Sequence, residues 1–439
     1  MNFILMKKAT VYIYFFCLCC YGLQAQKTLT LEEAITTALA NNYDIMIAEN
    51  DVKVTELNNA IGNAGILPNI SATFSKNNSI LNTTQTQSGG TERTLDGAKN
   101  MNMSYGIGLD WTLFDGMRMF VRKERFENLE QQGKANLQRT IFTKISDVYK
   151  LYYAIEQQQQ QLNAIDTAIT ISNQRVTLLK NKFKIGKVSK LEVLNSEVDL
   201  QADESLKIQL QTILKASKLK LNELLVRDLQ QDFIVSDAIV YDELITYDEI
   251  LKLAEKQNPE LQAQIIAKKI ADLNLKEIKG ARYPSIRVTS GYNFTRSEAS
   301  LGFVTQSTGN GFVYGINASI PLFNGNNQNR NEKTAKINVE NAKLTLEQLK
   351  QNITTQLAIA YENFQAQLKL VKLEEKNVNI AKQNLDITLA KYKIGTLTPI
   401  ELRTAQQNYI DVLVRYSNAQ YLTKIAEINL KELAGNLKL

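Results

Sequence analysis

The chain has 439 residues, with 51 Lys+Arg, 45 Asp+Glu, three cysteines and no histidine. The absence of histidine excludes Ser-His-Asp and Cys-His catalysis, and also every metal site that needs an imidazole ligand. The cysteines are Cys17, Cys19 and Cys20; if the segment that contains them is removed, the mature chain has no thiol for a disulfide, a zinc site or a nucleophile.

The first 25 residues are typical of a secretory signal peptide. Lys7 and Lys8 precede an apolar run from Ala9 to Leu23, which is too short to cross a bilayer comfortably, and Ala25 is the expected last residue removed. A bacterial lipoprotein signal that ends at Cys20 is the alternative. Loss of the two lysines lowers the net charge from +6 to +4, which gives no reason to expect nucleic-acid binding.

A first repeat is predicted over residues 26–226. It opens with a short helix that has Thr30 as its N-cap, and a second helix ends just before Pro68. Two strands follow, at about 69–83 and 100–114.

The second of these strands alternates strictly between apolar and polar residues. Its odd positions are all apolar: Met101, Met103, Tyr105, Ile107, Leu109, Trp111 and Leu113. A period of two over about ten residues is typical of a transmembrane β-strand. An antiparallel sheet with one face on a soluble core would show the same alternation, so both interpretations stand at this point.

A very long helix is predicted next, because the segment from Met117 to Lys184 has no proline and only one glycine, Gly133. Roughly 70 residues of helix would be about 105 Å long, which exceeds any globular core. Apolar residues recur three or four apart, as in a coiled-coil seam; they include Ile145, Val148, Tyr152, Ile155, Ile165, Val176 and Leu179. The helix ends at a glycine turn near residue 186, from which a second helix returns.

The same plan is predicted again after a linker at 227–245. The second repeat, residues 246–439, has Thr246 as its first N-cap. Its strands are predicted at about 285–297 and 311–323, and its helical turn near residue 395.

Two matches between the copies indicate a tandem duplication. FKIGKVSKLEVL, which begins at Phe183, matches YKIGTLTPIELR, which begins at Tyr392, 209 residues later. LFDG and LFNG, which begin at Leu113 and Leu322, are separated by the same distance. Glycine at the end of these two segments fits a sharp exit from strand to helix.

Four strands cannot close a barrel in a bilayer, because single-chain barrels have at least about eight. An open edge in lipid would leave unsatisfied backbone groups that cost several kcal/mol each. If these strands span a membrane, several chains must therefore share one barrel, and three chains would supply about twelve strands.

In the order and doubled spacing of these features, the chain resembles the TolC-type outer-membrane efflux protein family. The resemblance implies a mainly α fold with a membrane β-barrel portion, in which a homotrimer shares a twelve-stranded barrel continuous with a long α-helical barrel. It implies a place in the cell outer membrane, with a large periplasmic portion. The implied partners are outer-membrane lipid, a periplasmic adaptor (membrane fusion) protein and an inner-membrane RND or ABC-type pump.

The resemblance also implies that the turns of the two helical hairpins meet the adaptor. The corresponding residues are Gly186, Lys187, Val188, Ser189, Gly395, Thr396, Leu397 and Thr398. These residues are also suited simply to building a turn, since glycine lets the chain reverse and Ser189 or Thr398 can cap the next helix.

A periplasmic gate is implied at Glu192, Tyr392 and Glu401. Leu397 stands where the best-known family member has a gate arginine, and Thr404 stands where it has a second aspartate, so that member's latch is not reproduced. A glutamate at a helix start is also a routine favourable partner of the helix dipole, which is the alternative role for Glu192 and Glu401.

The sequence therefore favours a passive exit duct for drugs, ions or proteins in a tripartite efflux or type I secretion system. No catalytic, cofactor-binding or metal-binding motif is recognised, and no phosphate-binding GxxxxGK[ST] loop occurs, so an enzyme is not expected. Acid pairs such as Asp199 and Glu204 are expected on solvated helices. The alternative function is a secreted or periplasmic coiled-coil structural or adhesion protein with a small soluble sheet.

Overall fold

The computed structural model describes residues 27–236, 238–302 and 304–437. The predicted signal peptide and the three cysteines lie outside the described residues. The chain divides into two compact units. Unit 1 contains the described residues up to Glu49, Leu137–Pro259, and the described residues from Lys350 onward, whereas unit 2 contains Asn50–Asn136 and Glu260–Leu349.

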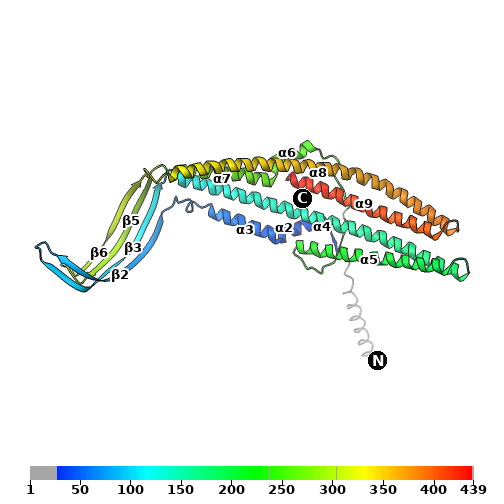
Figure 1. Cartoon of the computed structure of the whole chain (residues 1–439), viewed down its shortest axis with the longest axis horizontal. Coiled ribbons are helices and arrows are strands. Elements are labelled where there is room, and N and C mark those ends of the chain that lie inside the picture. Colours follow the sequence, from blue (N-terminus) through cyan, green and yellow to red (C-terminus); the bar gives the residue numbers. More distant parts are fainter. Residues whose placement is uncertain (1–26, 237, 303, 438–439) are drawn as a thin grey trace, which may run out of the picture. The chain divides into compact units, whose positions relative to one another are not determined.

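Unit 2 contains an antiparallel four-stranded sheet in the order β2-β3-β5-β6 (Figure 1). Its strands are β2 (Asn69–Thr86), β3 (Glu92–Phe114), β5 (Ser285–Ala299) and β6 (Gln306–Ser319). The β2–β3 hairpin extends further than its Thr- and Gln-rich sequence suggests, because backbone pairing continues to Thr86 opposite Glu92. Strand β6 ends earlier than predicted, since Pro321 has no backbone N–H to donate to a neighbouring strand.

One face of this sheet is apolar and exposed. Ile107, Tyr292 and Phe312 are aligned across three neighbouring strands by the register. Tyr105 stacks on Phe294 with ring centroids 4.9 Å apart. Since Tyr314 is 79% exposed, the sheet does not hide this face in a core.

Unit 1 is built from helices. It contains α2 (Leu31–Asn41), α5 (Lys190–Leu224), α6 (Tyr247–Gln257), α9 (Pro399–Leu433) and most of α4 (Arg118–Lys184) and α8 (Asn327–Lys393). The remaining helices, α3 (Tyr43–Asn58) and α7 (Pro259–Gly280), lie mainly in unit 2. Among the described residues, no helix is both long enough and apolar enough to cross a bilayer.

The core of unit 1 lies on the predicted seam of α4. Ile145, Val148, Tyr152 and Ile155 are all buried there. A two-stranded parallel sheet, β1 (Lys27–Leu29) with β4 (Phe233–Val235), packs beside them and was not predicted. The Tyr152 hydroxyl donates a hydrogen bond of 2.9 Å to the Leu29 carbonyl, which fastens this small sheet to the long helix.

Candidate functional site

Each helical hairpin of unit 1 ends in a tight turn, here called the first tip (residues 185–189) and the second tip (residues 394–398). Gly186 has a φ of 70°, and its N–H donates to the Phe183 carbonyl at 2.9 Å. Gly395 has a φ of 83° and donates to the Tyr392 carbonyl at 3.1 Å. Because a left-handed backbone is easily reached only by glycine, both turns depend on it.

The helix that follows each tip begins with a capping box. In the second tip, Glu401 accepts hydrogen bonds from the Thr398 N–H (2.7 Å) and hydroxyl (2.8 Å). In the first tip, Glu192 accepts longer bonds from the Ser189 N–H (3.3 Å) and hydroxyl (3.2 Å). The bonds from Thr398 hold the pKa of Glu401 below its ordinary value of 4.5.

The predicted adaptor-contact residues all lie at the surface of these tips. Six of them are exposed: Gly186, Lys187, Ser189, Gly395, Thr396 and Thr398. Val188 and Leu397 are half-buried. Apolar neighbours, including Ile185 and Ile394, are more than half exposed, so each tip offers an accessible surface with both polar and apolar groups.

Tyr392, the third predicted gate residue, is buried beside the other hairpin. Its ring lies 5.1 Å from the Lys182 Nζ at the end of α4, and its hydroxyl has no hydrogen-bond partner among the described residues. Burial raises the pKa of Tyr392; the positive charge of Arg175 opposes this rise and the Glu192 carboxylate adds to it. The structure therefore brings Tyr392 near the base of the first tip. Glu192 and Glu401 instead accept hydrogen bonds from the N-cap residues of their own helices, α5 and α9.

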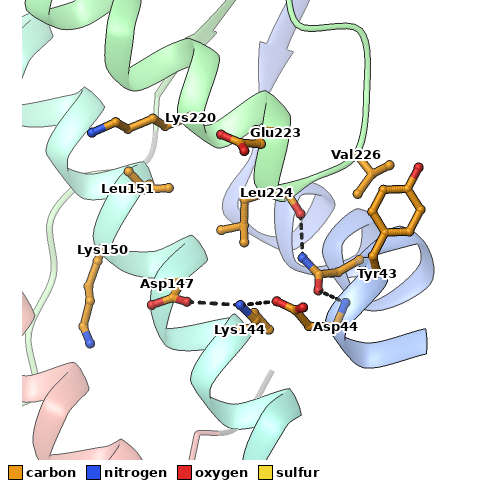
Figure 2. A pocket seen from close by; sticks show the side chains of 11 residues that line it. Tyr43, Asp44, Lys144, Asp147, Lys150, Leu151, Lys220, Glu223, Leu224 and Val226 are labelled. Atoms are coloured by element: carbon orange, nitrogen blue, oxygen red, sulfur yellow. Dashed lines mark hydrogen bonds and ion pairs between the residues drawn. The ribbon is translucent and has the colours of Figure 1, made fainter. Parts of the chain in front are cut away.

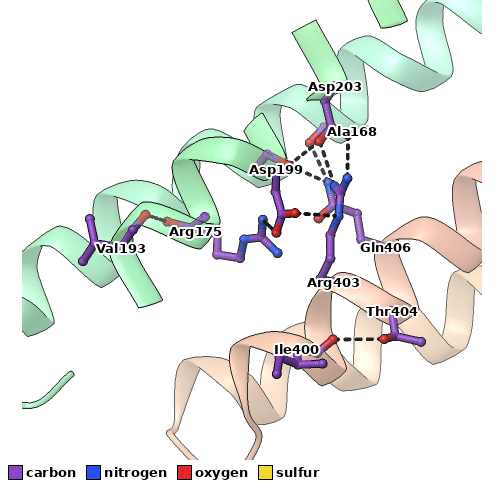
Figure 3. Close-up of polar contacts among 11 residues, drawn as sticks. Ala168, Arg175, Val193, Asp199, Asp203, Ile400, Arg403, Thr404 and Gln406 are labelled. Carbon is purple, nitrogen blue, oxygen red and sulfur yellow. Dashed lines mark hydrogen bonds and ion pairs between the residues drawn. The ribbon is translucent and has the colours of Figure 1, made fainter. Parts of the chain in front are cut away.

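A polar network that sequence reasoning missed joins the two hairpins (Figure 3). Arg403 of α9 donates two parallel hydrogen bonds to Asp203 of α5, at 2.9 and 3.0 Å. Asp203 is 4% exposed, and the Ser172 hydroxyl of α4 donates to the same carboxylate at 2.6 Å. Bidentate Arg–carboxylate pairs are among the stronger hydrogen-bonded contacts, so this pair fixes α9 against α5.

The network continues on both sides of that pair. Gln406 of α9 donates to the Ser172 hydroxyl at 2.8 Å and to the Ala168 carbonyl at 2.9 Å. Arg175 of α4 donates to Asp199 at 2.6 Å, and the Arg403 Nε lies 3.8 Å from the same aspartate. Asp199, expected on a solvated face, is therefore part of an ion-paired cluster.

A spacing signal for this network is present in the sequence. Ser172 and Arg175 fall on the buried seam of α4 that continues to Leu179, and Asp203 follows Leu200 on the buried side of α5. Polar residues at seam positions indicate buried polar pairing. The pattern could locate such residues, but only the structure shows that their partners come from α9.

A pocket of 470 Å³ lies elsewhere in unit 1, between the start of α3, α4 and the end of α5 (Figure 2). Lys144 is 2.6 Å from Asp44 and 3.9 Å from Asp147. The Asn42 side chain donates to the Leu224 carbonyl at 3.0 Å and so caps the end of α5. Polar side chains that line this pocket are thus engaged in contacts that hold the three helices together. Within the described part of the chain, no group of three or more Cys, Asp or Glu side chains is placed to hold a metal ion.

Comparisons with known proteins give one consistent result. A family model for "Outer membrane efflux protein" matches residues 34–226 and 250–436. The outer membrane protein TolC of Vibrio cholerae is 22% identical over 344 residues, which cover 76% of this chain and 77% of that protein. The outer membrane efflux protein BepC of Brucella suis is 20% identical over 438 residues, covering 94% and 87%.

Solved structures are similar over nearly the whole chain. The Campylobacter jejuni CmeC outer membrane channel superposes with a TM-score of 0.78 and 15% identity, covering 92% of this chain and 85% of that one. The outer-membrane channel OprN gives a TM-score of 0.76 and 16% identity, covering 92% and 90%. At these identities, the two likenesses establish a shared fold.

Proposed function

Because the chain belongs to the outer membrane efflux protein family, we propose that it is the passive exit duct of a tripartite efflux or type I secretion system. Membership itself makes the chain a non-enzymatic outer-membrane channel that takes part in efflux. The proposal adds a homotrimer, a periplasmic adaptor and an inner-membrane pump of the RND or ABC type. Energy comes from the pump, and the duct carries drugs, ions or proteins.

The exposed apolar face of the sheet is the observation that carries the proposal. Tyr314 is 79% exposed and Ile316 is 75% exposed, which is costly in water but favourable in lipid. Within the described residues, β2 and β6 each pair with one neighbour only. Free edges in lipid require further strands, and three copies of four strands supply the twelve that the proposed barrel needs.

The alternative of a secreted coiled-coil structural protein requires a different sheet. A small soluble sheet would cover its apolar face with its own chain, and Phe312 would then be buried. Phe312 is instead 64% exposed, which favours the membrane interpretation over the soluble one.

The two tips are the proposed adaptor contacts. Accessible turns with exposed apolar residues such as Ile185 and Ile394 suit a helical partner that meets them end on. Glu192, Tyr392 and Glu401 lie close to the tips and form the proposed periplasmic gate. The Arg403–Asp203 network supports a gate function, since it holds the two hairpins together and opposes their separation.

The assembly is tested on the mature protein purified in detergent. We expect a trimer by light scattering combined with refractive-index detection, which separates protein mass from detergent mass. A monomer that remains folded by circular dichroism would remove the shared barrel and, with it, the duct.

The docking function is tested by replacing Gly186 and Gly395 together with valine. A β-branched residue in the left-handed region costs about 1–2 kcal/mol per site, so both tips change shape while the sheet and the seam of α4 are untouched. Efflux in a strain that depends on this pump should fall, with the trimer intact. Gly89→Val, in the exposed turn between β2 and β3 where the glycine is not left-handed and an added Cβ meets nothing within 4 Å, is the matched control and should leave efflux unchanged. Normal drug tolerance in the double variant would count against docking at the tips.

A further inference from the structure

The two tips have the same backbone turn but different charge. From Lys182 to Leu191 the first tip and its flanks contain four lysines and no carboxylate. The equivalent segment 209 residues later, Lys391 to Ile400, contains two lysines and no carboxylate. The two extra lysines are Lys187, in the turn itself, and Lys190, at the first position of α5.

The fold uses these extra charges little: the Lys190 Nζ lies 5.8 Å from the centroid of the Phe183 ring, and Lys187 has no ion pair or ring contact among the described residues. A lysine at the first position of a helix faces the positive end of the helix dipole, which disfavours it. The second tip has Pro399 at the equivalent position, which is a preferred residue there. Lys187 and Lys190 are both exposed, and neither has a carboxylate within ion-pair distance among the described residues, although nearby Lys180 is paired with Glu197 at 2.8 Å.

The positive charge is therefore concentrated on one tip of a pair that lies at the same end of unit 1 (Figure 1). The Lys182 Nζ, 5.1 Å from the Tyr392 ring, keeps the ends of α4 and α8 side by side. A flat anionic membrane would meet both tips alike and would favour an equal number of lysines on both. The larger charge of the first tip instead matches a discrete partner with a localised acidic surface.

We propose that the first tip docks onto an acidic segment of the periplasmic adaptor, whereas the second tip makes an apolar contact through Ile394, Leu397 and Ile400. This inference rests on the proposed function, in which both tips meet the adaptor. The lysines of the first tip steer and orient the partner, and the contact of the first tip weakens as salt rises. Ile394 and Ile400 of the second tip are 76% and 77% exposed, and their contact depends little on salt.

The test places the photoreactive residue p-benzoylphenylalanine at Val188 or at its equivalent, Leu397, in the full-length protein in cells that contain its natural partners. Adducts are identified by mass spectrometry before and after Lys187→Thr with Lys190→Gln. The Val188 adduct should fall at least about fivefold in that background, and the Leu397 adduct should not. Thr396→Lys is the reciprocal variant and should make the Leu397 adduct sensitive to salt.

Permeabilised cells supply the second readout. Raising salt from about 0.1 M to about 1 M shortens the Debye length from about 10 Å to about 3 Å, and should reduce only the Val188 adduct. The peptide crosslinked to Val188 should be rich in Asp and Glu, unlike the one crosslinked to Leu397. The amount of assembled protein on native gels must be equal in all variants, which separates lost contact from lost folding.

Each other outcome has a distinct meaning. A Val188 adduct that resists both lysine removal and salt overturns the electrostatic docking while the proposed tip contact stands. A Val188 adduct to phospholipid overturns it in favour of a membrane contact. If neither position gives a protein adduct, the docking in the proposed function fails as well.

Discussion

At the end of the returning helix, the first copy of the repeat has Val226 where the second copy has Gly435. Both residues adopt a left-handed backbone, with φ of 51° and 66°. The cap beside them is the same in both copies, since Asn42 donates to the Leu224 carbonyl at 3.0 Å and Asn258 donates to the Leu433 carbonyl at 2.8 Å. One backbone shape is therefore built twice, without strain by glycine and with strain by valine.

The contacts between the hairpins differ more deeply. Asp203 of the first copy is equivalent to Val412, and Arg403 of the second copy is equivalent to Leu194. The first copy supplies the acids and the second supplies the arginine of the central ion pair. Residues shared by the copies thus form the turns, and residues that differ form the joint between them.

Replacing Asp203 with alanine should have the largest effect on this joint, because it leaves Arg403 without its bidentate partner. Breaking a buried ion pair typically costs about 3–5 kcal/mol. The Arg403 side chain keeps 21% of its surface exposed, so screening by water places the cost near about 3 kcal/mol, or about a hundredfold in local opening. Hydrogen exchange of amides in α5 and α9 measures that opening.

Two controls sharpen this result. Asn408→Ala, at the exposed second-copy equivalent of Asp199, should change opening by less than about 0.5 kcal/mol. Asp203→Ala combined with Arg403→Ala should cost clearly less than the sum of the single substitutions. Strict additivity would show that the two side chains do not stabilise the joint through each other.

Substitutions at Gly435 and Val226, at the ends of the returning helices, should have the next largest effect on stability. In Gly435→Ala, the new Cβ would lie 2.5 Å from the Gln257 carbonyl oxygen at a φ of 66°, so we expect a loss of at least about 2 kcal/mol. Val226→Gly should act in the opposite direction and stabilise by about 0.5–1 kcal/mol, since relief of strain exceeds the added backbone entropy. Chemical unfolding of the detergent-solubilised protein compares the two variants. A destabilised Val226→Gly variant would mean that packing of the valine side chain outweighs its strain.

Much of the fold was predictable because repeated local signals determine it. Gly186 and Gly395 mark turns that only glycine forms easily, and seam residues such as Tyr152 are buried as expected. The fold class and the family are confirmed by the family model and the solved channels. Thr246 shows the limit of a local rule: it occupies the N-cap position, but its hydroxyl bonds to Glu249 rather than accepting from the backbone.

The joint between the hairpins was not predictable in the same way. Asp203 and Arg403 are 200 residues apart, and nothing local in either segment indicates the other. Asp199 was expected on a solvated helix face, yet a neighbouring helix supplies Arg175 as its partner. Pairing between distant helices depends on how their faces rotate toward each other, which a period of three to four residues does not determine.

Replacing Glu401 with glutamine should have the smallest effect of these substitutions. It distinguishes a role of Glu401 as a charge at the gate from its role in capping α9. If Glu401 contributes to a ring of charge at the periplasmic end, Glu401→Gln should lower the cation preference of the channel in planar bilayers at neutral pH. Protonation of Glu401 removes the same charge as the substitution, so the cation preference of the wild-type channel should fall to that of the variant at low pH. This fall should occur only below pH 4.5, because hydrogen bonds from Thr398 lower the pKa of Glu401. The stability that the Glu401 carboxylate gives to the start of α9 follows the same pH dependence. It is complete above the ordinary pKa of glutamate and is lost as pH falls through the lowered pKa of Glu401. Identical conductance and selectivity in both proteins, with faster hydrogen exchange at the start of α9 in the variant, would leave Glu401 as a helix cap alone. Glu192→Gln is the comparison variant for the cap alone: the longer bonds to Ser189 predict a weaker cap, so hydrogen exchange at the start of α5 should rise less than at the start of α9 in Glu401→Gln.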